Sequence, residues 1–146
     1  MQGPFARFSF VPLLSLATIV LLAAACTSIP TTSRTGVVHD ITIIEAPSPA
    51  NVKINPGDEV RFVNRRGDYV RVDLLETRTS ELTCNRGFYE YLGSFGRSRE
   101  YVDLEPNTSA SACFPTDDVI NYNVRMESAM AGRKKIVPAV ITVGDR

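Results

Sequence analysis

Short segments with the alternation of a β-strand recur throughout the chain after residue 36, and they restrict the fold more than any other feature of the sequence. Residues 59–64, Glu-Val-Arg-Phe-Val-Asn, alternate polar and apolar side chains as a half-buried strand does. Clusters of turn-forming residues separate the segments. The expected strands are 37–44, 52–54, 59–64, 69–74, 101–104, 110–114, 120–126 and 136–143. No sustained helical period accompanies them, apart from one short turn expected near residues 127–132. This pattern predicts an all-β domain, a Greek-key antiparallel β-sandwich over residues 37–146.

The turn Asn-Pro-Gly-Asp at 55–58 leads into a strand that ends in Phe-x-Asn at residue 64. Proline presets φ in such a turn, and glycine can adopt a positive φ. This segment resembles the start of the copper-binding half of cupredoxins. Residues 122–126 and the closing strand 139–144 resemble the final hairpin of that family. The resemblance covers most of residues 37–143 and implies a cupredoxin-like sandwich.

The ligands of a blue-copper centre are two histidines, one cysteine and usually a weak axial methionine. In the alignment that the resemblance implies, the family's first histidine ligand corresponds to a position near Val70, and its cysteine ligand corresponds to Met126. No histidine follows Met126 in the sequence. The one histidine of the sequence is His39, in the first expected strand. We therefore expect no blue-copper centre and no cofactor. One alternative stays open, an atypical Cu(I) site of Met126, Met130 and His39, because thioethers suit Cu(I). Methionines also pack readily in cores and loops.

The N-terminal region has the layout of a secretory signal, because a single early charge, Arg7, precedes an apolar run over residues 8–25. The run ends in Leu-Ala-Ala-Ala-Cys at 22–26, which resembles the lipobox at which bacterial lipoproteins are cleaved and acylated. The resemblance implies a signal peptide over residues 1–25, palmitate-type acyl chains on Cys26, and a polar tether over 26–36. A retained transmembrane helix is the alternative, since about 20 apolar residues can span a bilayer. No basic stop-transfer cluster follows the run.

The residue after Cys26 is Thr27 rather than aspartate. By resemblance to the sorting pattern of Gram-negative lipoproteins, this favours the outer membrane, with the domain facing the periplasm. In a Gram-positive cell the same anchor would hold the protein on the single membrane.

Two cysteines remain besides Cys26, namely Cys84 and Cys113. Two cysteines in an exported domain most readily pair, so we expect a Cys84–Cys113 disulfide. A redox or metal site is the alternative, but the two residues lack a Cys-x-x-Cys spacing and a nearby histidine.

The numbers of basic and acidic residues are equal, 16 each. A chain with this balance gives no argument for nucleic acid as a partner. Catalysis by acid–base or nucleophilic chemistry needs a base beside a nucleophile, or paired carboxylates. No such constellation is visible, so we do not expect an enzyme.

The segment 84–99 interleaves arginines and aromatic residues between glycines. Such residues are enriched at the hot spots of protein interfaces, and we expect a partner-binding loop that uses Arg86, Tyr89, Tyr91 and Arg97. Arg71 and the pair at 65–66 could extend the same surface. In the alternative interpretation, the aromatic side chains cover one end of the core and the arginines point to water.

These features together predict a lipid-anchored, non-catalytic binding or assembly module in the cell envelope. Its partners would be the membrane, through the lipid, and an envelope protein that the sequence does not identify. A periplasmic copper or electron-transfer protein with the atypical Met126 and Met130 site is the alternative. The sequence leaves the oligomeric state open.

Overall fold

The computed structural model describes residues 33–92, 98–127 and 134–145. The chain divides into two units, Met1–Pro30 and Thr31–Arg146, and all described elements belong to the second. Among the described residues, no helix is long and apolar enough to cross a membrane.

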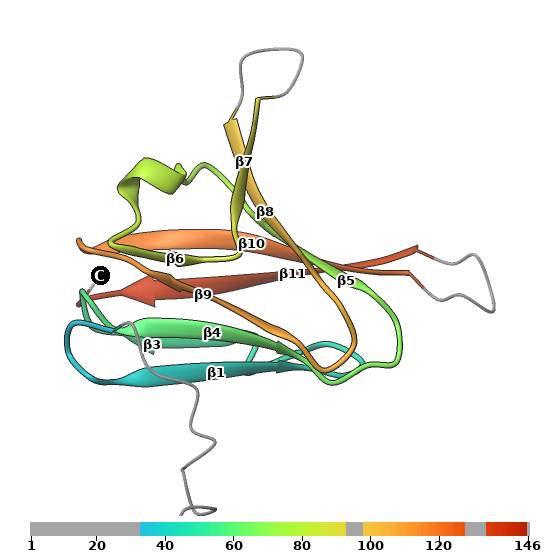
Figure 1. Cartoon of the computed structure of the whole chain (residues 1–146). Coiled ribbons are helices and arrows are strands. Elements are labelled where there is room, and N and C mark those ends of the chain that lie inside the picture. Colours follow the sequence, from blue (N-terminus) through green and yellow to red (C-terminus); the bar gives the residue numbers. More distant parts are fainter. Residues whose placement is uncertain (1–32, 93–97, 128–133, 146) are drawn as a thin grey trace, which may run out of the picture. The chain divides into compact units, whose positions relative to one another are not determined.

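Two β-sheets form the second unit (Figure 1). The five-stranded sheet has the order β2 (Pro47–Ser48), β1 (Val38–Ile43), β4 (Glu59–Asn64), β9 (Ser109–Cys113) and β6 (Cys84–Arg86). The six-stranded sheet has the order β3 (Asn51–Ile54), β11 (Lys134–Val143), β10 (Asp118–Glu127), β5 (Val70–Leu74), β8 (Ser98–Leu104) and β7 (Tyr89–Leu92). A short 3-10 helix, η2 (Thr79–Glu81), precedes β6. The predicted all-β sandwich is confirmed.

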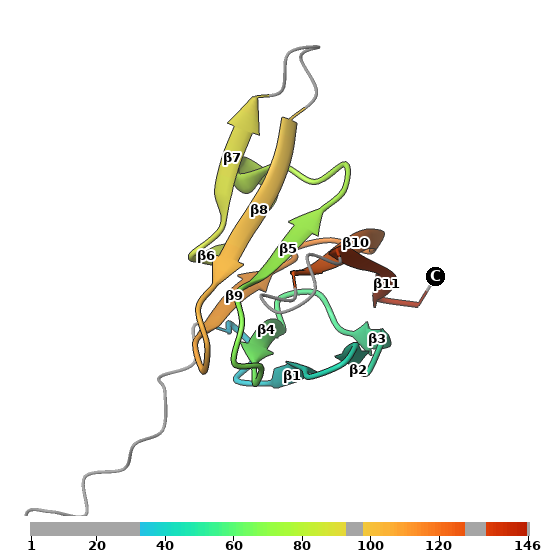
Figure 2. The ribbon, with the colours of Figure 1, turned by 90° about the vertical axis from the view of Figure 1, so that its right-hand side faces the viewer.

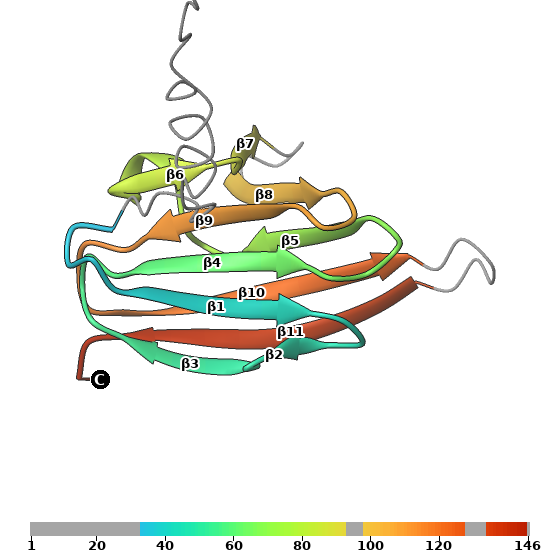
Figure 3. The ribbon, with the colours of Figure 1, turned by 60° about the horizontal axis from the view of Figure 1, so that its bottom comes forward.

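The chain passes from one sheet to the other at the connections β2–β3, β3–β4, β4–β5, β5–β6, β6–β7, β8–β9 and β9–β10, and several of these crossings can be followed in Figure 3. β10 lies between β11, which follows it in the sequence, and β5, which is distant in the sequence. Most neighbouring strands are antiparallel. Two pairs are parallel, β1 with β4 and β3 with β11, and in both pairs the two strands are not consecutive in the sequence.

The core lies between the two sheets. Tyr122 of β10 and Phe62 of β4 are fully buried, and their rings meet edge to face with centroids 5.3 Å apart. Phe88 meets Phe62 in the same way at 5.8 Å. Such offset contacts suit the quadrupole of aromatic rings. The aromatic rings therefore link the two layers at the centre of the domain.

Residues 84–99 were expected as a loop, but the structure places strands there. After β6, a turn at Gly87, with φ of +96°, redirects the chain into the other sheet. β7 and β8 then pair as antiparallel strands, and their hairpin extends beyond the neighbouring strands in Figure 2. β7 is an edge strand of the six-stranded sheet, and its first two residues, Tyr89 and Glu90, are both exposed.

Part of the expected tether is attached to the domain. The hydroxyl of Ser33 donates to the carbonyl of Gly57 at 3.1 Å, and the amide of Arg34 donates to the same carbonyl at 3.2 Å. Thr35 Oγ1 donates to Asp58 Oδ1. Residues 33–36 thus belong with the folded domain, and Cys26 itself lies outside the described residues.

Candidate functional site

The two positions at which the cupredoxin resemblance places copper ligands are neighbours in the structure. Val70 of β5 pairs with Met126 of β10 on one side and with Leu104 of β8 on the other. All three side chains are buried, with 1 to 3% of their surface exposed. At these positions the structure has apolar side chains that pack in the core.

The remaining candidates for copper do not gather there. His39 pairs with Val60 near the start of β4, whereas Asn64, at the end of β4, donates from its amide to the carbonyl of Leu104. At about 3.3 Å per residue, the four steps along β4 from Val60 to Asn64 span about 13 Å. Met130 lies outside the described residues.

His39 has another structural role. Its Nε2 lies 3.0 Å from Oδ2 of Asp58, a carboxylate that is fully buried. Burial by itself would raise the pKa of Asp58, but hydrogen bonds from Thr35, from the amide of Asn55 and from His39 together lower it. The histidine therefore helps to hold the turn before β4. Residues of the described part of the chain include no group of three or more His, Cys, Asp or Glu that could hold a metal. The donor set thus does not fit a blue-copper centre.

The expected disulfide is confirmed. Cys84 and Cys113 occupy directly opposite positions on β6 and β9, and their sulfur atoms are bonded. Cys113 is fully buried. The bond attaches the three-residue strand β6 to the five-stranded sheet.

A surface of tyrosine and arginine lies on the outer side of the six-stranded sheet. On β5, Val70, Val72 and Leu74 fill the core, so the alternate residue Arg71 faces outward. Arg71 is paired with Asp103 of β8, and Tyr101 of β8 is paired with Tyr89 of β7. We call the surface formed by Arg71, Tyr89, Tyr101 and Asp103 the tyrosine–arginine face.

Contacts within the tyrosine–arginine face fix the position of the Arg71 guanidinium. Nε and Nη2 of Arg71 donate to the two carboxylate oxygens of Asp103 at 2.6 and 2.7 Å. The same guanidinium lies 4.6 Å from the ring centroid of Tyr101. Arginine is protonated throughout the physiological pH range, and the hydrogen bonds to Asp103 raise the pKa of Arg71 further. The ring of Tyr89 is 6.5 Å from that of Tyr101, and Tyr89 is 65% exposed.

The four residues expected to bind a partner are not all on this face. Tyr89 is part of it. Tyr91 follows on β7, paired with Arg99, and its side chain is not described. Arg86 lies on β6, in the other sheet, and Arg97 lies outside the described residues. Sequence reasoning had assigned Tyr101 to a strand without recognising its place beside Tyr89, because the register of β7 and β8 joins residues twelve positions apart.

The fold and these contacts define an all-β, two-sheet sandwich with an exposed tyrosine–arginine face. No family model matches the chain, and no curated protein matches it. Solved structures with a similar arrangement include variants of amicyanin. A methionine-to-glutamine variant with Cu(I) has a TM-score of 0.47 and 12% identity, covering 73% of this chain and 82% of that chain. A methionine-to-alanine variant with Cu(I) has a TM-score of 0.48 and 12% identity, covering 80% and 87%. Likeness at this level carries no conclusion about function.

Proposed function

We propose that the chain is a lipid-anchored, non-catalytic binding module of the cell envelope, held on the outer membrane by acyl chains on Cys26 and facing the periplasm. In this proposal the β-sandwich presents the tyrosine–arginine face to an envelope protein. No cofactor takes part.

The observation that carries the proposal is the arrangement of Arg71 between Asp103 and Tyr101, beside the exposed ring of Tyr89. Tyrosine and arginine are enriched among the residues that dominate binding energies at protein interfaces. Because Asp103 and Tyr101 already hold the guanidinium, binding would require little further ordering of this side chain. A preordered arginine with adjacent tyrosine rings is well suited to contact another protein.

The ion pair contributes to recognition more than to stability. The side chains of Arg71 and Asp103 are 46% and 48% exposed, and solvent screens such pairs. Tyr89 lies on the edge strand β7 of the six-stranded sheet, and its side chain is accessible. These features support a role in binding.

Site-specific crosslinking tests the proposal in the intact, acylated chain. A photoreactive phenylalanine analogue replaces Tyr89, and a matched control carries it at Ile44, which follows β1 and is 57% exposed. We expect a discrete crosslinked protein from position 89 that the control does not give. Equal or absent crosslinking at the two positions would contradict the proposal.

The lipid anchor has its own test. Cys26→Ala should leave the precursor unacylated and abolish labelling by a fatty-acid analogue, while the wild-type chain is labelled and sediments with membranes. Labelling of the Cys26→Ala variant would refute the assignment of Cys26.

A further inference from the structure

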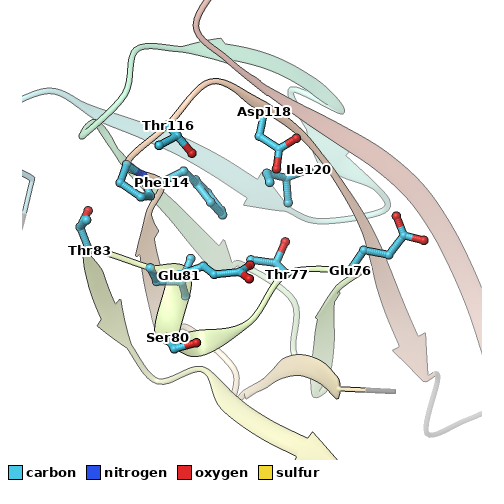
Figure 4. Close-up of a pocket in the computed structure, with 11 residues that line it drawn as sticks. Glu76, Thr77, Ser80, Glu81, Thr83, Phe114, Thr116, Asp118 and Ile120 are labelled. Atoms are coloured by element: carbon cyan, nitrogen blue, oxygen red, sulfur yellow. The ribbon is translucent and has the colours of Figure 1, made fainter. Parts of the chain in front are cut away.

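A cleft of about 660 Å³ opens at one end of the sandwich (Figure 4). One wall is the connection between β5 and β6, residues 76–83, which contains η2. The other wall is the connection from β9 into β10, residues 114–120. The volume is in the range typical of small-molecule sites. The cleft is separate from the tyrosine–arginine face, none of whose residues line it.

The two walls are fastened at both ends. At one end, the disulfide joins Cys84 to Cys113, and the amide of Thr83 donates to the carbonyl of Cys113 at 2.9 Å. At the other end, the amide of Leu75 donates to the carbonyl of Asn121 at 2.9 Å. The residues that line the cleft lie between these two attachment points on each wall. The cleft is therefore preformed by the fold rather than by chance packing of two free loops.

The bottom of the cleft is apolar. Phe114 and Ile120 line it and are 3% and 4% exposed, and Leu82 packs against the same core from the opposite wall. An apolar surface of this kind favours the burial of a hydrocarbon group.

The polar part of the lining is acidic. Glu81 comes from one wall and Asp118 from the opposite wall, as Figure 4 shows, and Glu76 is a third carboxylate of the lining. Among the described residues, no lysine, arginine or histidine lines the cleft. Within the described residues, these three carboxylates form no ion pair. Glu81 accepts the amide of Arg78 at 3.1 Å, and Asp118 accepts the amide of Val119 at 2.8 Å.

We propose that this cleft binds a primary ammonium group carried on an apolar stem. The stem would contact Phe114 and Ile120, and the ammonium would lie between Glu81 and Asp118. The charge of the lining selects a cation, and the apolar floor favours a cation with a hydrocarbon stem over a compact hydrated ion. Such a group belongs to free alkylamines and to the lysine side chain of a protein.

A titration followed by NMR on the full mature domain tests the proposal. The probes are hexylamine and, as its neutral counterpart, 1-hexanol. We expect saturable shifts of the amide signals of Thr83, Phe114 and Ile120. Hexylamine should bind about fivefold more tightly than the alcohol, because the alcohol cannot form the solvent-screened ion pairs with the carboxylates of the cleft. Equal binding of the two probes, or shifts confined to other regions, would overturn the proposal.

Variants that remove carboxylate charges distinguish an effect of the cleft residues on hexylamine binding from an effect of the protein's net charge. Glu81→Gln with Asp118→Asn keeps an acceptor oxygen for each backbone amide and removes two charges, so hexylamine should bind about fivefold more weakly. Glu45→Gln with Glu105→Gln makes the same charge change outside the cleft and should not alter binding. Glu81→Gln alone is measured as well, so that a folding defect of the double variant does not decide the result. Unchanged affinity in the folded cleft variants would refute the site.

A third probe distinguishes the two sources of the ammonium. A short peptide of sequence Ala-Ala-Lys-Ala-Ala, amidated and acetylated, competes with hexylamine. Tighter binding of the peptide would assign the cleft to a lysine of a partner protein, and weaker binding would assign it to a free amine; both results support the site. A peptide with lysine replaced by norleucine should not compete, and equal competition by that peptide would contradict the need for a cation.

Discussion

Removal of the Cys84–Cys113 disulfide should lower the free energy of unfolding by about 3.6 kcal/mol. The bond joins residues 29 positions apart. In the chain-entropy description, a loop of this length restricts the unfolded chain by about 12 cal/mol/K, which gives about 3.6 kcal/mol at 25 °C. Because domains of this size are stable by about 5–15 kcal/mol, the loss would be a large part of the total.

The structure indicates which substitution isolates this effect. Cys113 is fully buried, so a serine hydroxyl there would need a new hydrogen-bond partner. Cys84→Ala with Cys113→Ala avoids that cost. β6 has three residues and pairs with β9 through Cys84 and Cys113 themselves. Local loosening around β6 should therefore accompany the loss of stability.

Urea unfolding of the oxidised protein, the dithiothreitol-reduced protein and the double alanine variant provides the measurement. We expect both forms without the bond to unfold at lower urea, with a somewhat larger dependence on denaturant, because the unfolded chain becomes less compact. A loss below about 1 kcal/mol in both forms would refute the loop-closure reasoning.

Three further predictions concern single side chains. Tyr122→Phe should raise the free energy of unfolding by about 1 kcal/mol, because the buried hydroxyl of Tyr122 has no hydrogen-bond partner within the described structure; a loss of stability in thermal or urea unfolding would contradict this. Asp58→Asn should destabilise the domain near pH 7 by about 1–3 kcal/mol and flatten the acid limb of a stability–pH profile. The pKa of Asp58 is lowered in the folded state, so its contribution is complete above the unfolded value of about 3.9 and is lost as the pH falls through the folded value; an unchanged acid limb would show that the charge of Asp58 does not matter. Copper titration followed by metal analysis should show no stoichiometric binding that depends on Met126, because this thioether is buried in the core; tight binding lost in Met126→Leu would favour the copper alternative.

The alternation of residues was enough to locate most strands. Residues 59–64 form β4 with the expected bounds, and its alternate residues Val60 and Phe62 are fully buried in the core. The disulfide followed from the number of cysteines in a domain expected to be exported. These features depend on local pattern and composition, which a single sequence contains.

Features that depend on pairing between distant strands were not predicted. β7 and the first two residues of β8 were expected as part of a loop over residues 84–99, since Tyr-Glu-Tyr-Leu is short and lies between glycines, whereas residues 101–104 of β8 were expected as a strand. The place of Arg71 beside Tyr101 needs the register of β5 and β8, which joins positions 71 and 103. The cleft needs two connections that are more than 30 residues apart in sequence. No local pattern specifies such neighbours.

The attachment of residues 33–36 to the turn at Gly57 was also missed. Their composition, Ser-Arg-Thr-Gly, is that of a polar linker. The structure uses the same hydroxyl groups as hydrogen-bond donors to Gly57 and Asp58. Polar composition predicts exposure better than it predicts disorder.

Capture of the partner from native membranes tests the central claim most directly. The acylated wild-type chain is compared with Tyr89→Ala combined with Tyr101→Ala, and with Ile44→Ala as a control of similar exposure outside the tyrosine–arginine face. We expect the same envelope protein to copurify with the wild type and the control, and its recovery to fall at least about tenfold with the double variant, since a loss of about 1.4 kcal/mol at a hot spot gives that factor. Undiminished recovery by a double variant that keeps the thermal stability of the wild type would contradict the account.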